Sequence, residues 1–191
     1  MQKARGFTLI ELMVVMAIAA ILMSLAAPAF KRTIQSNAMS SAVNTFLSDT
    51  RFARSESVRL GGSVIMCRAD TPEDSAPTCG TNAGPGGNGW VTGWIIFQDR
   101  DGSGNYNVGD TLLRVQAALP APDSILEGVA STSTPLKFTG TGRLLSSTGT
   151  ATLHFGGSNY PTAVQRVVCV GLGGRARIAG DGSTSCGSTN E

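Results

Sequence analysis

Residues 7–30 read FTLIELMVVMAIAAILMSLAAPAF, a run of 24 residues whose single charge is Glu11. About 20 such residues in a helix reach about 30 Å, the thickness of the hydrocarbon core of a bilayer. Basic residues flank the run on both sides: Lys3, Arg5, Lys31 and Arg32. A cleaved secretory signal has a shorter apolar region, of about 7–15 residues, and a small-residue cleavage site. We therefore expect residues 7–30 to form a transmembrane helix, with a plain signal anchor as the alternative.

Glu11 is the exception in this apolar run. A carboxylate inside a membrane span costs several kcal/mol unless a cation pairs with it, so such residues usually serve a function. The sequence therefore predicts a cationic partner for Glu11.

The segment around Glu11 resembles the class III signal of type IV pilins and pseudopilins. It reads Gly6-Phe7-Thr-Leu-Ile-Glu11 and follows Lys3-Ala-Arg5. The resemblance implies that residues 1–6 are a leader, that a prepilin peptidase cuts between Gly6 and Phe7, and that Phe7 is then methylated. It also implies that Glu11 pairs with the N-terminal amine of a neighbouring pilin subunit during fibre assembly. The expected location is the bacterial inner membrane, through residues 7–30, with a periplasmic head that joins a pilus at the cell surface.

Residues 31–62 are expected to continue the helix in amphipathic form. One stripe of the helix is apolar, and its residues are Ile34, Ala38, Ala42, Phe46 and Ala53, flanked by Val43, Leu47 and Phe52. The polar side is expected to hold Lys31, Gln35, Asp49, Arg51 and Glu56. Pro28 should bend the helix, because it removes a backbone donor and crowds the carbonyl of Ser24. Gly61-Gly62 should end it.

Residues 63–191 are expected to form a β-rich head of antiparallel sheet. Short apolar runs alternate there with turn clusters such as Gly84–Gly89 and Ser146–Gly149. The expected strands are 63–68, 94–98, 111–116, 135–139, 151–155, 166–170 and 175–178. The fold class is therefore α+β: a long bent N-terminal helix packed on a head of antiparallel sheet.

The charge of the chain is divided unevenly. The 191 residues carry a formal net charge of +2, with 15 basic and 13 acidic side chains. Without Lys3 and Arg5 the two signs are equal, so binding to a polyanion would need a local patch. Such a patch is expected in residues 131–191, where two acidic residues accompany five basic ones: Lys137, Arg143, Arg166, Arg175 and Arg177.

Four cysteines lie beyond the apolar run. Cys67 and Cys79 enclose 11 residues, and Cys169 and Cys186 enclose 16. Four cysteines allow three pairings, and we favour these two local ones. Disulfides require an oxidising compartment such as the periplasm. A zinc site is the competing interpretation, but no C-x-x-C pair is present and the chain has one histidine.

The segment 99–110 resembles a calcium-binding loop in its spacing. Oxygen ligands fall at the loop positions of an EF-hand, and these residues are Asp99, Asp101, Ser103, Asn105, Asn107 and Asp110. The flanking residues are predicted strands, however, and Asp, Asn and Gly also favour tight turns. An ordinary hairpin turn is therefore the preferred interpretation, and no metal is expected.

Catalysis is not expected from this sequence. His154, the single histidine, lies in an alternating strand pattern and lacks the G-x-S-x-G elbow that a serine hydrolase would need. No Walker loop and no paired carboxylates in an apolar setting are present either, so we expect a non-enzymatic protein without cofactors.

The segment Gly174-Arg175-Ala176-Arg177 is the strongest candidate for binding. Arg175 and Arg177 are two residues apart, so on a strand both side chains project from one face. Guanidinium groups bind phosphate oxygens in a forked geometry, which suits the backbone of DNA. The alternative is that the two arginines only protect an edge strand from pairing with another sheet.

The whole chain resembles the GspH/FimT group of minor pilins and pseudopilins. The resemblance lies in the N-terminal signal, the single long helix, the β-rich head and the late Gly-Arg-x-Arg segment. FimT-like minor pilins take part in natural transformation and contact DNA through that segment, which implies non-specific DNA binding by Gly174, Arg175 and Arg177. The three other basic residues of the patch are weaker candidates: Lys137, Arg143 and Arg166. The alternative is a structural, GspH-like pseudopilin of a type II secretion system that does not bind DNA.

Overall fold

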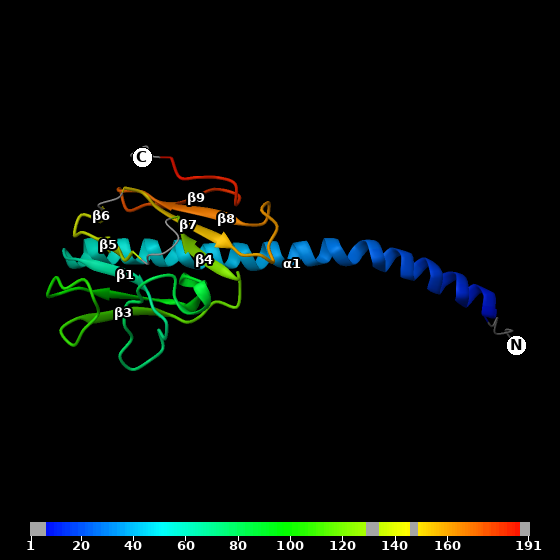
Figure 1. Ribbon diagram of the computed structural model, residues 1–191, viewed down its shortest axis with the longest axis horizontal. Coiled ribbons are helices and arrows are strands. Elements are labelled where there is room, and N and C mark those ends of the chain that lie inside the picture. The colour runs from blue at the N-terminus through cyan, green and yellow to red at the C-terminus, as the bar shows by residue number, and fades with distance from the viewer. Residues whose placement is uncertain (1–6, 129–133, 146–148, 188–191) are drawn as a thin grey trace, which may run out of the picture. The chain divides into compact units, whose positions relative to one another are not determined.

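The structure is a computed structural model that describes residues 7–128, 134–145 and 149–187. It divides into two compact units, Met1–Asn37 and Ala38–Glu191. One helix, α1 (Leu9–Leu60), contributes to both units, and the chain leaves it at Gly61-Gly62 as expected. Figure 1 shows the blue part of α1, which belongs to the first unit, as a gently curved helix that continues through residue 28.

The first unit is an apolar helix with exposed side chains. An 18-residue window of α1 has a mean hydropathy of 2.5 and is long and apolar enough to cross a membrane. Large apolar side chains such as Leu9, Met13 and Ile21 are more than 60% exposed. A surface of this kind is stable in lipid or against other apolar helices, since water does not solvate it favourably.

The second unit contains two antiparallel sheets. The first has the strand order β3-β2-β1-β5-β6. Its strands are β1 (Val64–Arg68), β2 (Trp94–Gln98), β3 (Thr111–Gln116), β5 (Leu136–Phe138) and β6 (Leu144–Leu145). The second sheet has the order β4-β7-β8-β9. Its strands are β4 (Ser124–Glu127), β7 (Ala151–Gly156), β8 (Arg166–Val170) and β9 (Ala176–Gly180). Two short 3-10 helices precede β2, η1 (Pro85–Gly87) and η2 (Trp90–Thr92).

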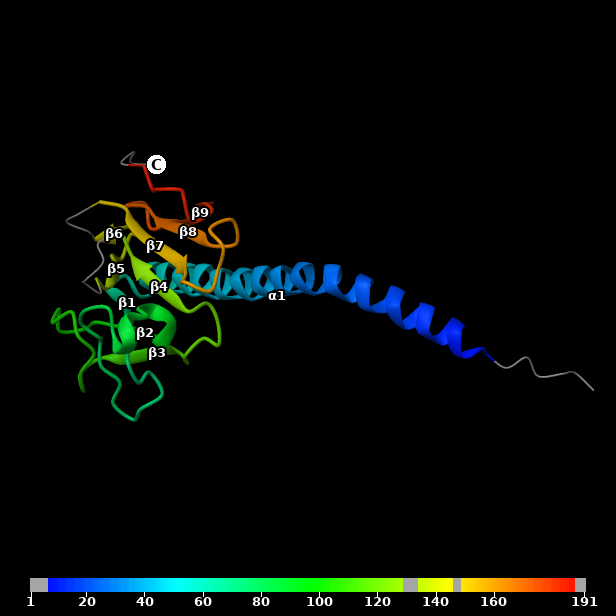
Figure 2. The same ribbon diagram turned by 45° about the vertical axis from the view of Figure 1, so that its right-hand side comes forward.

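Both sheets pack on the part of α1 that belongs to the second unit. Figures 1 and 2 show this cyan segment between β2–β3 on one side and β8–β9 on the other. Phe46 of α1 is fully buried, and its ring meets the rings of Trp90, Trp94 and Phe155 edge to face at 5.6–5.7 Å. Aromatic pairs favour this geometry. The helix therefore supplies the centre of one core that both sheets share.

The expected α+β fold is confirmed. All seven predicted strands are present with ends within two residues of those expected, whereas β4 and β6 were not predicted. β4 reads Ser-Ile-Leu-Glu, which does not alternate between apolar and polar residues, and β6 has only two residues, so neither gives the sequence signal of a strand. The structure also contains both local disulfides, Cys67–Cys79 and Cys169–Cys186, with Cα–Cα distances of 5.5 and 5.8 Å.

One expectation for α1 is wrong. The helix pattern places Asp49 on the polar side, but this residue is 3% exposed. Its carboxylate accepts hydrogen bonds from Trp94 Nε1 at 2.8 Å and from Arg114 Nη1 at 2.5 Å. Arg114 in turn lies over the ring of Phe52, 3.9 Å from its centroid. A buried charge is tolerated when it is paired and hydrogen-bonded in this way.

Replacing Asp49 is expected to destabilise the second unit. Asp49→Ala leaves the Trp94 N–H buried without an acceptor and should lower the free energy of unfolding by about 2 kcal/mol. Asp49→Asn keeps an acceptor for Trp94 and should cost less. Thermal unfolding of the full-length chain in detergent, followed by tryptophan fluorescence, measures both. Equal losses in the two variants would assign the effect to the Arg114 ion pair instead.

Candidate functional site

The Gly-Arg-x-Arg segment forms the turn between β8 and β9 and the start of β9. Gly171 N–H donates to the carbonyl of Arg175 at 3.0 Å, and Gly174 N–H donates to the carbonyl of Gly171 at 2.8 Å. The disulfide from Cys169 of β8 to Cys186 ties the segment after β9 to the same sheet. These bonds fix the backbone on both sides of Arg175.

Gly174 brings this turn against the loop between β5 and β6. Its φ is +72°, and a Cβ at this position would overlap the carbonyl oxygen of Gly142. The amide of Leu144 also donates to the carbonyl of Leu172 at 2.9 Å, so the two loops are joined. Only glycine combines a positive φ with such a close backbone approach at little cost. The glycine of the motif therefore determines where the following arginine lies.

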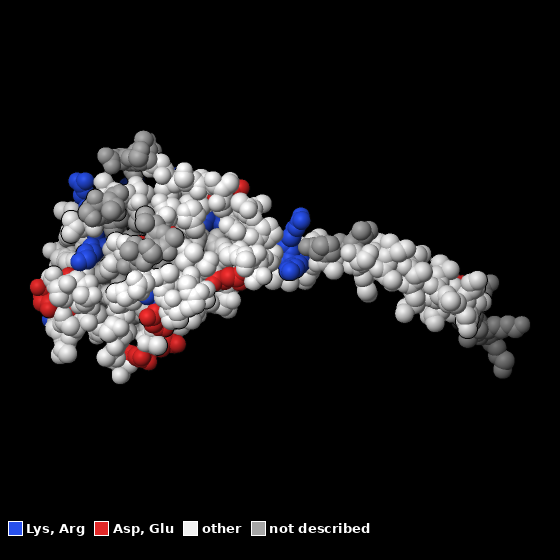
Figure 3. Space-filling view, viewed as in Figure 1, with Lys and Arg blue, Asp and Glu red and all other residues white. Residues whose placement is uncertain are grey.

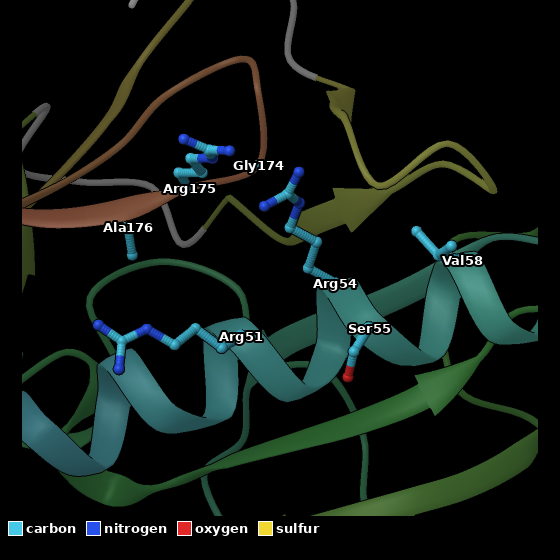
Figure 4. A pocket seen from close by; sticks show the side chains of 7 residues that line it. All are labelled: Arg51, Arg54, Ser55, Val58, Gly174, Arg175 and Ala176. Atoms are coloured by element: carbon cyan, nitrogen blue, oxygen red, sulfur yellow. The ribbon is translucent and has the colours of Figure 1, made fainter.

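Arg175 lines a groove that the turn forms with α1. The groove has a volume of about 590 Å³, and its lining residues are Arg51, Arg54, Ser55, Val58, Gly174, Arg175 and Ala176. Figure 4 shows Arg51 extending along α1 and Arg54 pointing away from it, while Arg175 comes from the turn on the other side. Arg54 Nε donates to the carbonyl of Gly142 at 3.0 Å, which holds this side chain next to Gly174. Three guanidinium groups thus share one groove.

Arg177 does not line this groove. It lies in β9 opposite Cys169 of β8 and is exposed. Its neighbour Ala176 packs against the core, and successive side chains of a strand point to opposite faces. Arg177 therefore presents its charge on the outer face of the sheet, whereas Arg175 precedes β9 and lines the groove from the turn.

The three weaker candidates lie in different places. Arg143 is exposed and follows Gly142, so it is close to the motif turn. Lys137 of β5 places its ammonium group against Gly104 in the acidic 99–110 loop. Arg166 begins β8, at the end away from the turn, and its Nη1 donates to the carbonyls of Ala163 and Gln165 at 2.8 and 2.7 Å. Of the three, the structure brings only Arg143 near the motif.

Sequence reasoning missed Arg51 and Arg54 as members of the site. The helix pattern places Arg51 on the polar side, and it is exposed as that implies. The spacing of three residues does show that the two arginines lie on one helix face. The sequence carries no signal for which turn of the sheet covers that face, so it could not connect them with Arg175.

Acidic and basic residues of the second unit lie in different parts of its sequence. Residues 60–130 contain three basic and eight acidic side chains, and the basic ones are Arg68, Arg100 and Arg114. Two of these three are in ion pairs, Arg68 with Asp70 and Arg114 with Asp49. Figure 3 shows that most acidic atoms of this unit, on the face in view, lie along its lower part. The excess of positive charge is therefore at the β8–β9 side.

The 99–110 loop joins β2 to β3, as the hairpin interpretation required. Carboxylate oxygens of Asp99, Asp101 and Asp110 lie within 4.8 Å of one another. All three accept hydrogen bonds from backbone amides of the loop, for example Asp99 from Gly104 at 3.2 Å and Asp101 from Ser103 at 2.9 Å. The bonds from Ser103 and Asn107 lower the pKa of Asp101 to about 2, whereas burial raises the pKa of Asp99. The loop thus stabilises its carboxylates with its own donors.

His154 is an ordinary strand residue in the structure. It lies in β7, paired with Leu126 of β4 and Val167 of β8, and is half-buried. Its position in the middle of the second sheet agrees with the alternation that predicted a strand there.

Glu11 closes the first turn of α1. Its Oε2 accepts hydrogen bonds from both the amide and the hydroxyl of Thr8, each at 2.9 Å, and the Glu11 amide donates to Thr8 Oγ1 at 3.3 Å. This reciprocal arrangement is a capping box, whose sequence pattern is Ser or Thr followed three residues later by Glu or Gln. Sequence analysis missed this role, although Thr8-Leu-Ile-Glu11 fits the pattern. Gly6 and the rest of the expected leader lie outside the described residues.

Comparison with known proteins identifies two regions of the chain. The family model of the type II transport protein GspH matches residues 42–174, and that of the prokaryotic N-terminal methylation motif matches residues 1–27. The GspH match includes Arg51 and Arg54 and ends at Gly174, so Arg175 and Arg177 follow it. No curated protein matches the chain.

Two solved structures match the chain, both of the type IV minor pilin FimU of Pseudomonas aeruginosa. The crystal structure in space group P21 has a TM-score of 0.55 and 21% identity, and the match covers 80% of this chain and 95% of FimU. The structure in space group P65 has a TM-score of 0.44 and 18% identity, over 78% and 98% of the two chains. The first of these shows a shared fold. Because the GspH model covers more than half of its length, the chain belongs to the GspH family and is a GspH/FimT-like type IV pilin.

Proposed function

We propose that this chain is a minor type IV pilin that binds DNA non-specifically through Gly174, Arg175 and Arg177 and supports DNA uptake in natural transformation. The observation that carries the proposal is the fixed turn that presents two exposed arginines at the positive side of the second unit. Neither arginine has an ion pair within the described residues, so both are free to bind a phosphate.

The chemistry of these side chains favours phosphate over base edges. Guanidinium groups form short, charge-assisted hydrogen bonds with phosphate oxygens. Sequence readout needs several side chains inserted into a groove of DNA, and contacts to the backbone alone carry no sequence information. Binding is therefore expected to be weak and independent of sequence, with a dissociation constant of about 10⁻⁴–10⁻⁶ M.

Removing the two charges tests the proposal. In Arg175→Gln/Arg177→Gln the full-length chain in detergent should lose most of its affinity for a labelled random-sequence duplex, measured by fluorescence anisotropy. Log affinity should also become less dependent on log salt, by about 0.9 for each phosphate that the variant no longer neutralises. Arg59→Gln/Arg100→Gln removes the same charge elsewhere and is expected to bind like the wild type. Unchanged affinity in the first variant would contradict the proposal.

A second candidate function is that of a structural pseudopilin of a type II secretion system. The observation that favours it is the family match to a type II transport protein, which ends at Gly174 before either arginine of the motif. This alternative predicts no DNA binding by the wild-type chain. It also predicts that Arg175→Gln/Arg177→Gln leaves secretion and fibre assembly intact.

The N-terminal motif supports a proposal for processing and assembly. A prepilin peptidase would cut between Gly6 and Phe7 and methylate Phe7, and residues 7–30 would hold the protein in the inner membrane with its second unit in the periplasm. Glu11 would then pair with the new N-terminal amine of a neighbouring subunit, as a buried carboxylate requires a cation. The family match to the methylation motif and the apolar helix support this proposal.

A further inference from the structure

We propose that Arg51 and Arg54 of α1 form one wall of a groove that binds the sugar-phosphate backbone of DNA, and that Arg175 forms the opposite wall. This inference rests on the proposed DNA-binding function and extends the binding surface from the Gly-Arg-x-Arg turn to the helix. We call the groove lined by Arg51, Arg54, Ser55, Val58, Gly174, Arg175 and Ala176 the arginine groove.

The arginine groove contains only positive ionisable groups. Its seven lining residues include three arginines and no acidic residue. Three other arginines of the second unit are neutralised by ion pairs, since Arg59 is paired with Glu56, and Arg68 and Arg114 are paired with aspartates. Arg51 and Arg175 are exposed and have no ion pair within the part of the chain that the structure describes. Unneutralised guanidinium groups that line one hollow favour an anionic ligand.

Arg54 is held in position before any ligand arrives. Its Nε donates to the Gly142 carbonyl at 3.0 Å, and its side chain passes next to Gly174. Because Nε is used in this way, the two terminal nitrogens of the guanidinium group remain for the groove. Figure 4 shows this guanidinium group directed from α1 toward the turn that carries Arg175. Preorganised donors lose less conformational entropy when they bind.

The spacing of the two helix arginines suits a nucleic-acid strand. Residues three apart on an α-helix differ by about 4.5 Å along its axis. One strand of B-DNA presents a phosphate for about every 3.4 Å of its axis, and two long, flexible arginine side chains can reach neighbouring phosphates of such a strand. Val58 and Ala176 supply apolar surface beside the arginines, against which deoxyribose rings can pack. These features favour a strand of backbone over a single small anion.

Arg51 is the residue to change, since Arg54 also supports the Gly142 loop. Arg51→Gln in the full-length chain should raise the dissociation constant for a random-sequence duplex about fivefold to tenfold and reduce the log–log salt slope by about 0.9. Arg59→Gln is the matched control, an exposed arginine of the same helix that is paired with Glu56 outside the groove. It should leave affinity and slope unchanged, and both variants should melt at the wild-type temperature.

The outcomes separate this inference from the proposed function. If Arg51→Gln binds DNA like the wild type while Arg175→Gln/Arg177→Gln does not, α1 does not contribute to the DNA-binding surface. The proposed DNA-binding function then stands without the arginines of the helix. If the wild-type chain does not bind DNA, both are wrong. If Arg51→Gln weakens binding to phosphatidylglycerol vesicles but not to DNA, the groove is a lipid site and this inference is overturned.

Discussion

Glu11→Gln is expected to insert into the membrane normally and to be lost from assembled fibres. The substitution removes one charge from the apolar helix, which makes insertion easier. In the proposed pair between Glu11 and the N-terminal amine of a neighbouring subunit, removing the carboxylate costs about 3–5 kcal/mol, because the amine remains buried without compensation. Since about 1.4 kcal/mol is a factor of ten in an equilibrium, incorporation should fall about a hundredfold or more. Immunoblots of sheared surface fibres and of the membrane fraction measure the two quantities.

The capping box makes Glu11→Gln a selective test. Gln serves as well as Glu at the third position of a capping box, so the hydrogen bonds with Thr8 can persist while the charge is lost. Thr8→Ala is the matched control, because it removes the cap hydroxyl and keeps the carboxylate, at a cost of about 1 kcal/mol to the helix. It is expected to assemble almost normally. If Thr8→Ala is lost from fibres as completely as Glu11→Gln, the cap and not the charge would be the requirement.

Periodicity and turn signals in the sequence were sufficient for the fold class and for most of the elements. The apolar run 7–30 and the stripe through Phe46 predicted α1 almost to its ends, because a 52-residue helix repeats its pattern many times. Longer strands such as β2 and β8 were located correctly because they are apolar runs between turn clusters. β6, with two residues, depends on its pairing with β5, which only the folded chain provides.

The candidate site was predictable only in part. Gly174, Arg175 and Arg177 are adjacent in the sequence, so a local pattern revealed them. Arg51 is more than 120 residues away from that segment, and its place beside Arg175 depends on how the β8–β9 turn packs over α1. The sequence wrongly predicted that Asp49 lies on the polar side of α1, for a related reason. A helix pattern shows which face a residue occupies, but not that Trp94 and Arg114 will cover that face with hydrogen-bond donors.

Gly174→Ala is expected to weaken DNA binding even though both arginines of the motif remain. Alanine at a φ of +72° is strained, and its Cβ would overlap the carbonyl oxygen of Gly142, which is backbone and cannot rotate away. The turn must therefore move or the second unit must lose stability, on the order of 3 kcal/mol. Movement of the turn displaces Arg175 from Arg51 and Arg54, and a loss of stability lowers the fraction of chains that hold these residues together. We expect a lower melting temperature and at least a tenfold loss of affinity, which corresponds to about 1.4 kcal/mol.

The neighbouring Gly173 provides the matched control for this substitution. A Cβ at Gly173 has no heavy atom within 4 Å among the described residues, and this glycine does not have a positive φ. Gly173→Ala should therefore keep both the melting temperature and the DNA affinity of the wild type. The two variants differ by one position and have the same composition, so a difference between them reports the packing of the two loops against each other. If Gly174→Ala binds DNA as tightly as Gly173→Ala, the position of Arg175 against α1 does not matter for binding, and Arg175 and Arg177 act as free surface charges.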